Sequence, residues 1–291
     1  AYPKNIEYLY NTGVAEMALG QLMNAEKHFK QCLEQDANHA ASINNLAAIC
    51  MRLDKIDEAK TLLHRVLEIL PDDTISKHML AAISDEKKPH PTCIEYAKNL
   101  FNNYALYYDR HMLTQLEYQV PTAFKSLLQT HHLSHFDQAL DIGCGSGLLA
   151  EQIWSFTSQM DGVDVAENMI EIAESKQRYR TLYCDDIYHH LQTHQQIYDI
   201  IFAADVLPYF GELEPLFQLI FDRLTKGGYF LFNTEVSDSR PWYLQKTGRF
   251  AHSQSYIEQV SQSFNVIDQQ AIFGRKQKNQ SLTVNVFLLQ K

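Results

Sequence analysis

The chain has 291 residues, of which 45% are hydrophobic and 21% are charged, so it is suited to folding into two globular domains of ordinary size. Its formal net charge of -10 argues against nucleic acid or an anionic membrane surface as the main partner. The five cysteines are odd in number, widely spaced and never in a C-x-x-C pair, which indicates neither disulfides nor a zinc site and makes a reducing cytoplasm the expected location.

The first ten residues, AYPKNIEYLY, lack the basic, apolar and small-residue order of a secretion signal. No uninterrupted run of about eighteen apolar residues follows them in the sequence. We therefore expect a soluble protein with no membrane partner.

An internal repeat with a period of thirty-four residues comes first in chain order. The matching positions are Gly13 with Ala47, Ala25 with Ala59, Phe29 with Leu63, and Cys32 with Val66. Small residues at the first two pairs of positions let two helices approach closely, and the larger apolar residues supply contact between them. The period is that of the tetratricopeptide repeat.

This repeat predicts an all-α tetratricopeptide domain over residues 1–88, with two full repeats and a capping helix in TISKHMLAAISDEKK. Pro71 closes the second repeat, and Pro3 falls at the closing position of a repeat that is absent, so we expect a chain cut from a longer array. Such arrays present a groove to a peptide or protein partner. Packing against the next domain alone is the alternative role.

The pattern changes after DEKKPHP, and two helical stretches indicate a helical lid or linker over residues 89–137. Over residues 138–291 short apolar runs alternate with amphipathic ones, which predicts a parallel sheet with helices on both faces. The last two apolar runs, NVIDQQAIFG and LTVNVFLLQ, predict an antiparallel hairpin at the sheet edge.

Three glycines at alternate positions, Gly143, Gly145 and Gly147, follow the first of these apolar runs in DIGCGSG. In doubly wound sheets a ligand binds at the carboxyl ends of the strands, where a glycine-rich first turn lets it approach the backbone. A dinucleotide would favour the spacing G-x-G-x-x-G, whereas this turn reads G-x-G-x-G. A tight turn without a ligand is the other alternative.

Asp141 followed by G-x-G-x-G resembles the first motif of the class I S-adenosylmethionine-dependent methyltransferases. GVDVAENM, the pair Asp185-Asp186, AADVLPYF and RLTKGGYFLFNTE match later motifs of that family in order, so the resemblance runs from about residue 94 to the C-terminus. It implies a Rossmann-like fold with a mixed seven-stranded sheet over residues 138–291. With repeats in front, the chain resembles a bacterial group of tetratricopeptide-containing methyltransferases whose substrates are generally unassigned.

The resemblance implies S-adenosylmethionine as the cofactor, S-adenosylhomocysteine as its product, and no metal. Asp164 would accept both ribose hydroxyls, and Asp186, favoured over Asp185, would accept the adenine amino group. Tyr104 and Tyr108 would cover the methionine end, although at helical spacing they could equally form a packing stripe. The expected cofactor-binding residues are Asp141, Gly143, Cys144, Gly145, Gly147, Asp164, Val165, Met169, Asp185, Asp186, Ile187, Ala204, Tyr104 and Tyr108.

Candidate catalytic residues lie in RPWYLQKTGRFAHSQSY, where this fold's substrate loop usually runs. Arg249 could hold a carboxylate or phosphate of the acceptor through a forked pair of hydrogen bonds. His252 could act as a base or as a hydrogen-bond donor. The alternatives are that Arg249 pairs with Glu235 on the surface and that His252, with Ser253, only caps the next helix.

Two histidine clusters raise the question of a metal site. They are His131, His132 and His135 in THHLSHF, and His189, His190 and His194 in YHHLQTH. These histidines precede apolar residues, have no evident carboxylate partners and are typical of helix ends. The sequence therefore predicts no metal site.

Three functions remain open on the sequence alone. The first is methylation of a carboxylate or hydroxyl on a small or carrier-bound metabolite, because the core is similar to carboxylate methyltransferases acting on aconitate or carrier-bound malonate. The second is a protein methyltransferase whose repeats hold the substrate chain. The third is a cofactor-bound scaffold or assembly protein without turnover.

Overall fold

The computed structural model describes residues 5–84, 92–238, 240–277 and 280–291. The predicted boundary at residues 88 and 89 and the predicted repeat closure at Pro3 lie outside these ranges. Contacts between Cα atoms divide the chain into two compact units. The first is Ala1–Tyr96 with Leu244–Arg249, and the second is Ala97–Tyr243 with Phe250–Lys291.

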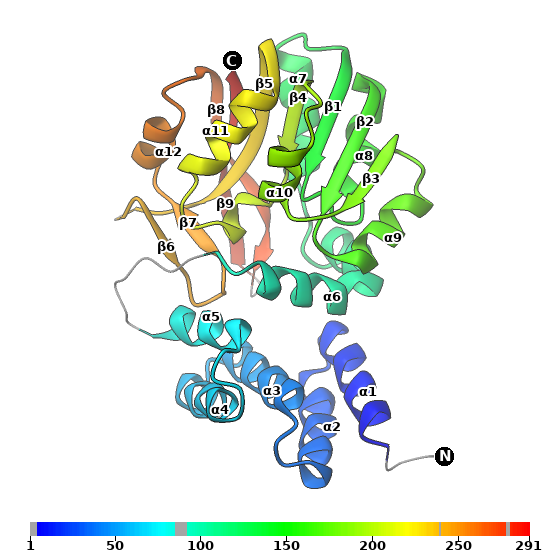
Figure 1. Ribbon diagram of the computed structural model, residues 1–291, viewed down its shortest axis with the longest axis vertical. Helices are drawn as coiled ribbons and strands as arrows, with labels where there is room; N and C mark the ends of the chain where they lie inside the picture. The colour runs from blue at the N-terminus through cyan, green and yellow to red at the C-terminus, as the bar shows by residue number, and fades with distance from the viewer. Residues whose placement is uncertain (1–4, 85–91, 239, 278–279) are drawn as a thin grey trace. The chain divides into compact units, whose positions relative to one another are not determined.

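Antiparallel helices build the first unit (Figure 1). They are α1 (Ile6–Ala18), α2 (Leu22–Gln35), α3 (Ala40–Arg52), α4 (Ile56–Ile69) and α5 (Thr74–Ile83). Each helix packs against the next, and the contacts are most extensive inside the pairs α1–α2 and α3–α4. The predicted all-α fold of this segment is confirmed.

Close approach of the paired helices explains the small residues of the repeat. A Cβ atom at Gly13 would lie 2.8 Å from the ring of Phe29, whose side chain is fully buried. Ala25 and Ala59 are also fully buried. The first unit also includes the short segment Leu244–Arg249, in which the Gly248 carbonyl accepts a hydrogen bond of 2.9 Å from Nε2 of the buried His78.

A mixed sheet forms the centre of the second unit. Its strands are β1 (Phe136–Ile142), β2 (Thr157–Asp164), β3 (Thr181–Cys184), β4 (Tyr198–Ala203), β5 (Leu224–Val236), β6 (Trp242–Leu244), β7 (Phe250–His252), β8 (Asn265–Gln277) and β9 (Gln280–Gln290). The order β3-β2-β1-β4-β5 is parallel, β9 runs antiparallel to β5, and β8 completes the predicted hairpin with β9.

Within the described residues the sheet has nine strands, where the sequence predicted seven. The additional strands, β6 and β7, are three residues each and lie in the segment predicted as a substrate loop. Glu235 and Val236, at the end of β5, pair in parallel with Ala251 and His252 of β7. Strands this short carry no alternating pattern that a sequence reading could detect.

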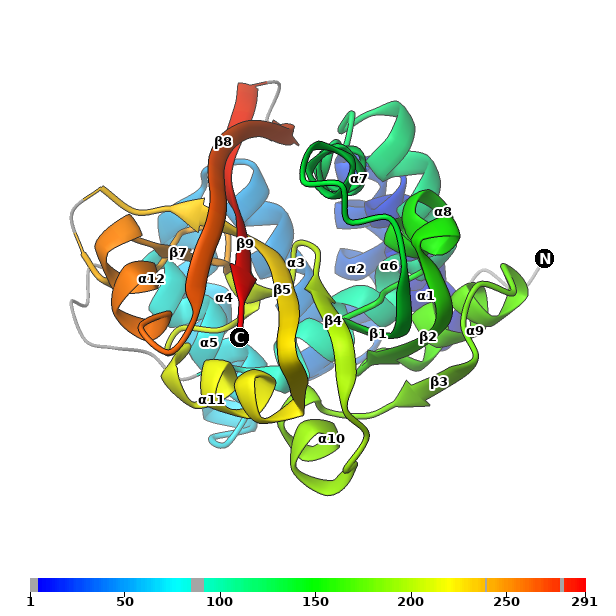
Figure 2. The ribbon, with the colours of Figure 1, turned by 90° about the horizontal axis from the view of Figure 1, so that it is seen from above.

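Helices cover both faces of this sheet (Figure 2). The helices that follow the first five are α6 (Ile94–Thr114), α7 (Val120–Thr130), α8 (Leu148–Ile153), α9 (Glu167–Ser175), α10 (Ile187–Thr193), α11 (Glu214–Arg223) and α12 (Gln254–Val260), with 3-10 turns at Trp154–Phe156 and Leu207–Tyr209. Of these, α6 runs across the ends of the strands (Figure 1). One core lies under α7 and α8 and the other under α10, α11 and α12. Among the described residues, no helix is both long and apolar enough to cross a membrane.

We expect Phe29→Ala to lower the free energy of unfolding by roughly 3–5 kcal/mol, because the substitution leaves a cavity between α1 and α2 that the fixed backbone cannot fill. Met23→Ala on the same helix is the control, since Met23 is 71% exposed and its loss should cost less than about 0.5 kcal/mol. Urea unfolding followed by far-ultraviolet circular dichroism measures both. Equal effects would contradict the packing described for this repeat.

Candidate functional site

The glycine turn joins the end of β1 to the start of α8. Gly143 has a φ of 64°, and a Cβ atom there would lie 2.4 Å from Val206, so the protein itself excludes a side chain. Gly145 has a φ of 53°, yet a Cβ atom there would have no described heavy atom within 4 Å other than its chain neighbours. Open space therefore adjoins the turn at Gly145, where a ligand can approach the backbone.

Asp164 is the last residue of β2 and supports this turn. Its carboxylate accepts the Gly145 N–H at 2.8 Å and the Ala166 N–H at 2.8 Å. Burial raises the pKa of Asp164, although these backbone hydrogen bonds lower it in part. The Asp164 carbonyl also accepts the Asp185 N–H at 3.0 Å, so the ends of β1, β2 and β3 meet at one edge of the sheet.

Asp141 lies beneath the turn and has a partner that sequence reasoning missed. The Tyr179 hydroxyl donates a hydrogen bond of 2.7 Å to the Asp141 carboxylate, which is 1% exposed. Burial raises the pKa of Asp141 to about 7, although the Tyr179 hydrogen bond lowers it in part. The Tyr179 ring also lies 3.2 Å from where Gly147 would carry a Cβ atom. Tyr179 precedes β3 in RYRTLY, where no motif marks it.

Cys144 and Val165 differ in their surroundings. The Cys144 N–H donates to the Val163 carbonyl at 3.1 Å, and burial raises the pKa of the thiol well above its usual range. Cys144 is therefore held as a neutral thiol inside the turn. Val165, which follows β2, is half-buried, and its carbonyl accepts the Cys184 thiol at 3.9 Å.

Helix α6 is attached to the glycine turn through Asp109. The Ser146 hydroxyl donates to the Asp109 carboxylate, and Nζ of Lys176 lies 2.6 Å from it. Tyr104 and Tyr108 stand on the same helix, half-buried, with their rings edge to face and their centroids 5.2 Å apart. Residues 104–109 thus join the turn through Asp109, and the rings of Tyr104 and Tyr108 contact each other.

Three further candidates contribute to packing. Met169 is fully buried and packs with Ala105 of α6 and with Ala166. Ile187 is 7% exposed and belongs to the core under α10 and α11. Ala204 follows β4 and is half-buried against the core on the other face.

The acidic pair after β3 is already engaged in hydrogen bonds. Asp186 is the N-cap of α10, and its carboxylate accepts the His189 N–H at 3.0 Å. The Asp185 carboxylate accepts the Asp186 N–H at 2.8 Å and lies 2.7 Å from Nδ1 of His189. Both carboxylates are half-buried at the edge of the sheet where the glycine turn lies.

A buried charged group at the ends of β4 and β5 was missed by sequence reasoning. Asp205 has a φ of 63° and donates its N–H to the Asn233 side chain at 2.7 Å. Arg275 of β8 lies 3.5 Å from the Asp205 carboxylate and 3.1 Å from that of Glu235. A left-handed aspartate at a strand end is uncommon and concentrates at functional sites. AADVLPYF contained the signal for Asp205, whereas Arg275 is brought close only by the hairpin.

The two candidate catalytic residues lie in different units. His252 of β7 is fully buried, and its Nε2 donates to the Gly211 carbonyl at 3.0 Å. Burial lowers the pKa of His252 to about 4, so the ring is neutral at physiological pH and has no exposed surface. Arg249 ends the segment that belongs to the first unit and is 9% exposed. The predicted cap of α12 is Ser253, whose hydroxyl accepts the Tyr256 N–H.

The expectation that the clustered histidines lack carboxylate partners was wrong. His131 lies 2.6 Å from Asp268, which β8 brings to the end of α7. His135 lies 3.2 Å from Asp137. In the second cluster His189 contacts Asp185, as described above. Only Asp268 is distant in sequence from its histidine, whereas Asp137 and Asp185 lie two and four residues from theirs.

A hollow of about 370 Å³ lies away from the glycine turn. It is lined by residues 132–136, Asp199 and residues 225–229. These residues are at the amino ends of β1 and β4 and in the first part of β5. Ligands of doubly wound sheets bind at the carboxyl ends of the strands, so this hollow is not the candidate site.

Two segments match known families. Residues 140–232 match the family described as Methyltransferase domain, and residues 16–83 match the family described as Tetratricopeptide repeat. Ubiquinone biosynthesis O-methyltransferase from Hydrogenovibrio crunogenus is 29% identical over 102 residues, covering 33% of this chain and 41% of that protein. Malonyl-(acyl-carrier protein) O-methyltransferase from Bacillus cereus is 29% identical over 139 residues, covering 46% and 50%. The chain spans at most half the length of these curated relatives.

Solved structures agree with the fold. Magnesium protoporphyrin IX methyltransferase from Synechocystis, with bound SAH, superposes with a TM-score of 0.53 at 12% identity, covering 68% of this chain and 99% of that one. An S-adenosylmethionine-dependent methyltransferase from Clostridium acetobutylicum gives 0.50 at 18% identity, covering 66% and 99%. The predicted Rossmann-like class I fold is confirmed.

Between pH 5 and pH 8 we expect the free energy of unfolding of the wild type to fall by roughly 2–3 kcal/mol more than that of Asp141→Asn. The pKa of Asp141 is about 7 in the folded chain, above its value of about 3.9 in unfolded chains. The stabilisation from its proton is therefore fully present below about pH 4 and is lost as pH rises through about 7. Urea unfolding at both pH values measures the difference.

Asp222→Asn, at an exposed position of α11, is the control for this prediction, because it makes the same chemical change at a carboxylate that is not buried. A pH slope that is the same in wild type and Asp141→Asn would contradict the buried state of Asp141.

Proposed function

Because the chain carries a methyltransferase domain and tetratricopeptide repeats, we propose that it transfers a methyl group from S-adenosylmethionine to an oxygen acceptor. The acceptor is a carboxylate or hydroxyl of a small or carrier-bound metabolite. The observation that carries the proposal is the hydrogen bond between Asp164 and Gly145, which sets a buried carboxylate beside the open space at the glycine turn.

Asp164 suits the ribose of the cofactor. An ionised carboxylate has about four lone-pair directions, and the backbone N–H groups of Gly145 and Ala166 occupy two of them. Acceptor capacity remains for two hydroxyls. Asp186 stands at the end of the neighbouring strand as the acceptor for the adenine amino group. Tyr104 and Tyr108, on the helix that Asp109 attaches to the turn, are the residues to cover the methionine end.

The bound cofactor supplies a methyl group on a sulfonium, which is an activated leaving group. The protein's task is to hold the acceptor oxygen about 3 Å from that methyl and in line with the bond that breaks. A carboxylate acceptor is already ionised and needs no base, whereas a hydroxyl must lose a proton. The burial and low pKa of His252 favour an acceptor of the first kind.

Asp205 and Arg275 take the place that Arg249 and His252 held in the sequence prediction. Asp205 follows β4, and its left-handed backbone is held by Asn233 and Arg275. We assign Arg275 to holding the acceptor carboxylate and Asp205 to orienting the Arg275 guanidinium. The names of the relatives support an oxygen acceptor, because both are O-methyltransferases.

A protein acceptor is the second candidate, and the tetratricopeptide match is the observation that favours it. Repeats of this kind present peptide-binding grooves, so they could hold a partner chain while one of its side chains is methylated. A scaffold without turnover is the third candidate.

Five free cysteines, four of them buried, fit a reducing cytoplasm as the location.

We expect calorimetric titration to show micromolar binding of S-adenosylhomocysteine and no binding of NADH. Asp164→Ala should weaken the affinity about tenfold or more, which corresponds to a lost ribose contact of about 1.4 kcal/mol or more. Asp222→Ala, far from the turn in sequence and exposed, should bind like wild type. Absence of S-adenosylhomocysteine binding would refute the cofactor assignment and leave the scaffold in the lead.

We expect extract incubated with the protein and methyl-labelled S-adenosylmethionine to yield base-labile methyl esters or stable methyl ethers in the metabolite or carrier pool. Asp205→Asn should lower kcat/KM for that acceptor about tenfold or more while leaving S-adenosylhomocysteine affinity unchanged. Label found only on Lys, Arg or Gln side chains of proteins would establish the second candidate instead. Absence of any transfer despite cofactor binding would establish the scaffold.

A further inference from the structure

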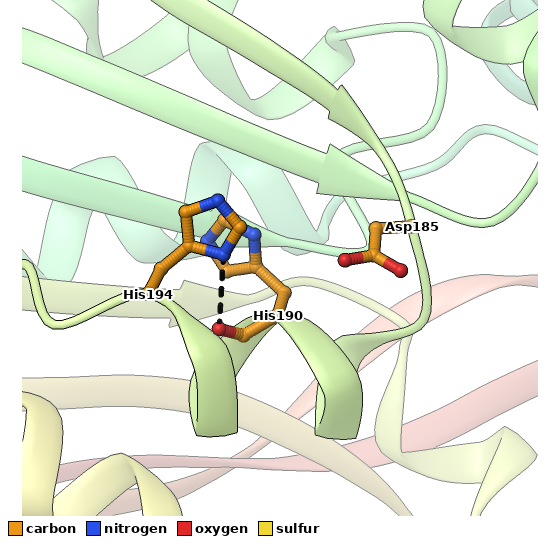
Figure 3. A group of neighbouring side chains, drawn as sticks. All are labelled: Asp185, His190 and His194. Atoms are coloured by element: carbon orange, nitrogen blue, oxygen red, sulfur yellow. Dashed lines mark hydrogen bonds between the residues drawn. The ribbon is translucent and has the colours of Figure 1, made fainter.

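Two histidines and a carboxylate meet beside the carboxyl end of β3. Asp185 follows that strand, His190 lies in the last turn of α10, and His194 is the C-cap of that helix. The two histidines are four residues apart, so a helical backbone places them on one face. One ligand atom from each of the three residues lies within 4.8 Å of the other two (Figure 3).

The buried ring of His190 has two nitrogens that lack a partner in the described part of the chain. Its side chain is 1% exposed, and neither ring nitrogen has a hydrogen-bond partner among the described residues. Buried polar atoms are almost always paired, so two unpaired nitrogens on one ring are exceptional. Figure 3 shows this ring beside that of His194, with the Asp185 carboxylate on its other side. A ligand at this point would satisfy a nitrogen that no described protein atom satisfies.

The surroundings of the two histidines suit a metal ligand. The rings of His190 and His194 are stacked, with centroids 4.2 Å apart and planes inclined by 18°. The Tyr183 ring lies against both, at 4.6 and 4.9 Å. Neutral imidazole beside an apolar wall is the form in which histidine binds metals.

Asp185 is held in place by groups outside the cluster. The Asp186 N–H donates to its carboxylate at 2.8 Å, and Nδ1 of His189 lies 2.7 Å from it. Partners of this kind orient a metal-binding carboxylate and leave it lone pairs for the ion. His194 uses Nδ1 toward the His190 carbonyl at 3.3 Å, so Nε2 is the atom it would offer to a metal.

We propose that Asp185, His190 and His194 form a binding site for a divalent transition metal ion, with Zn²⁺ as the best match. Two imidazoles and one carboxylate are a common zinc ligand set that leaves the fourth position to water or another ligand. In a tetrahedral site the ligand atoms lie about 3.3 Å apart, so the present separations of up to 4.8 Å must shorten. His194 is half-buried, and its side chain can rotate toward the ion.

This site is independent of the proposed methyl transfer and changes one part of the sequence prediction. Asp185 was expected among the cofactor-binding residues, and no metal was expected at all. If Asp185 binds a metal, Asp186 remains free to accept a hydrogen bond from the adenine amino group, the role for which the sequence already favoured it. The sequence prediction treated the acidic pair and the histidines as separate motifs, whereas the fold places them together.

The test is titration of the full chain, first stripped of metal with a chelator, with Zn²⁺ in a calorimeter and with Co²⁺ in an absorption cell. Wild type should bind a single equivalent of Zn²⁺ and show the visible absorption of tetrahedral Co²⁺. His194→Ala and Asp185→Asn should each weaken Zn²⁺ binding by about 100-fold or more, exceeding the roughly 10–100-fold cost of losing an outer partner. Both residues are partly exposed, so these variants should fold even if His190→Ala does not.

Matched controls separate this site from the other metal-binding side chains nearby. His189→Ala removes an exposed histidine of the same helix, and Cys184→Ser removes the exposed thiol beside Asp185. Cys184→Ser should bind Zn²⁺ like wild type, whereas His189→Ala, which removes a partner that orients Asp185, should weaken Zn²⁺ binding by at most roughly 10–100-fold. Absence of stoichiometric binding, full binding by His194→Ala, or loss of binding in Cys184→Ser would each overturn the proposal.

Discussion

The hydrogen bond from the Gly145 N–H to the Asp164 carboxylate is the contact on which the site depends. It joins the turn after β1 to the end of β2, and the Asp164 carbonyl then receives the backbone of β3. Because parallel strands end at the same edge of the sheet, one carboxylate can organise three chain segments there. The left-handed glycine leaves open space beside that carboxylate, which is where the proposed cofactor would lie.

The buried polar residues behind this contact form a supporting layer. Tyr179 supplies the hydrogen bond that Asp141 needs in the absence of solvent, and its ring packs under the turn. Asp109 connects α6 to the same turn through Ser146 and Lys176. None of these side chains needs to touch a ligand. They keep the backbone of the turn where one can bind, because a buried polar group without a partner is costly and a paired one is rigid.

The two residues of the acidic pair, Asp185 and Asp186, have different surroundings. One short segment therefore supports both the metal site and the cofactor contact that we propose. Asp186 caps α10 and stands at the strand end where the adenine is expected. Asp185 lies in the proposed metal site with His190 and His194, whose rings are stacked on each other. At the other end of the sheet edge, Asp205 and Arg275 provide charge near the proposed acceptor. Binding of the cofactor and positioning of the acceptor thus draw on different strands.

The sequence alone determined the class of fold, the repeat and the glycine turn, because each depends on local periodicity or on the spacing of residues within one turn. Asp141, Asp164 and the pair Asp185-Asp186 were found for the same reason, since each directly follows or ends a recognisable apolar run. Tertiary structure decided the contacts between residues far apart in the chain. It brought Arg275 to Asp205 and His194 to Asp185, and it buried His252 in the sheet. Burial and partners separated by many residues leave no periodic trace in a sequence, so only the packed fold reveals them.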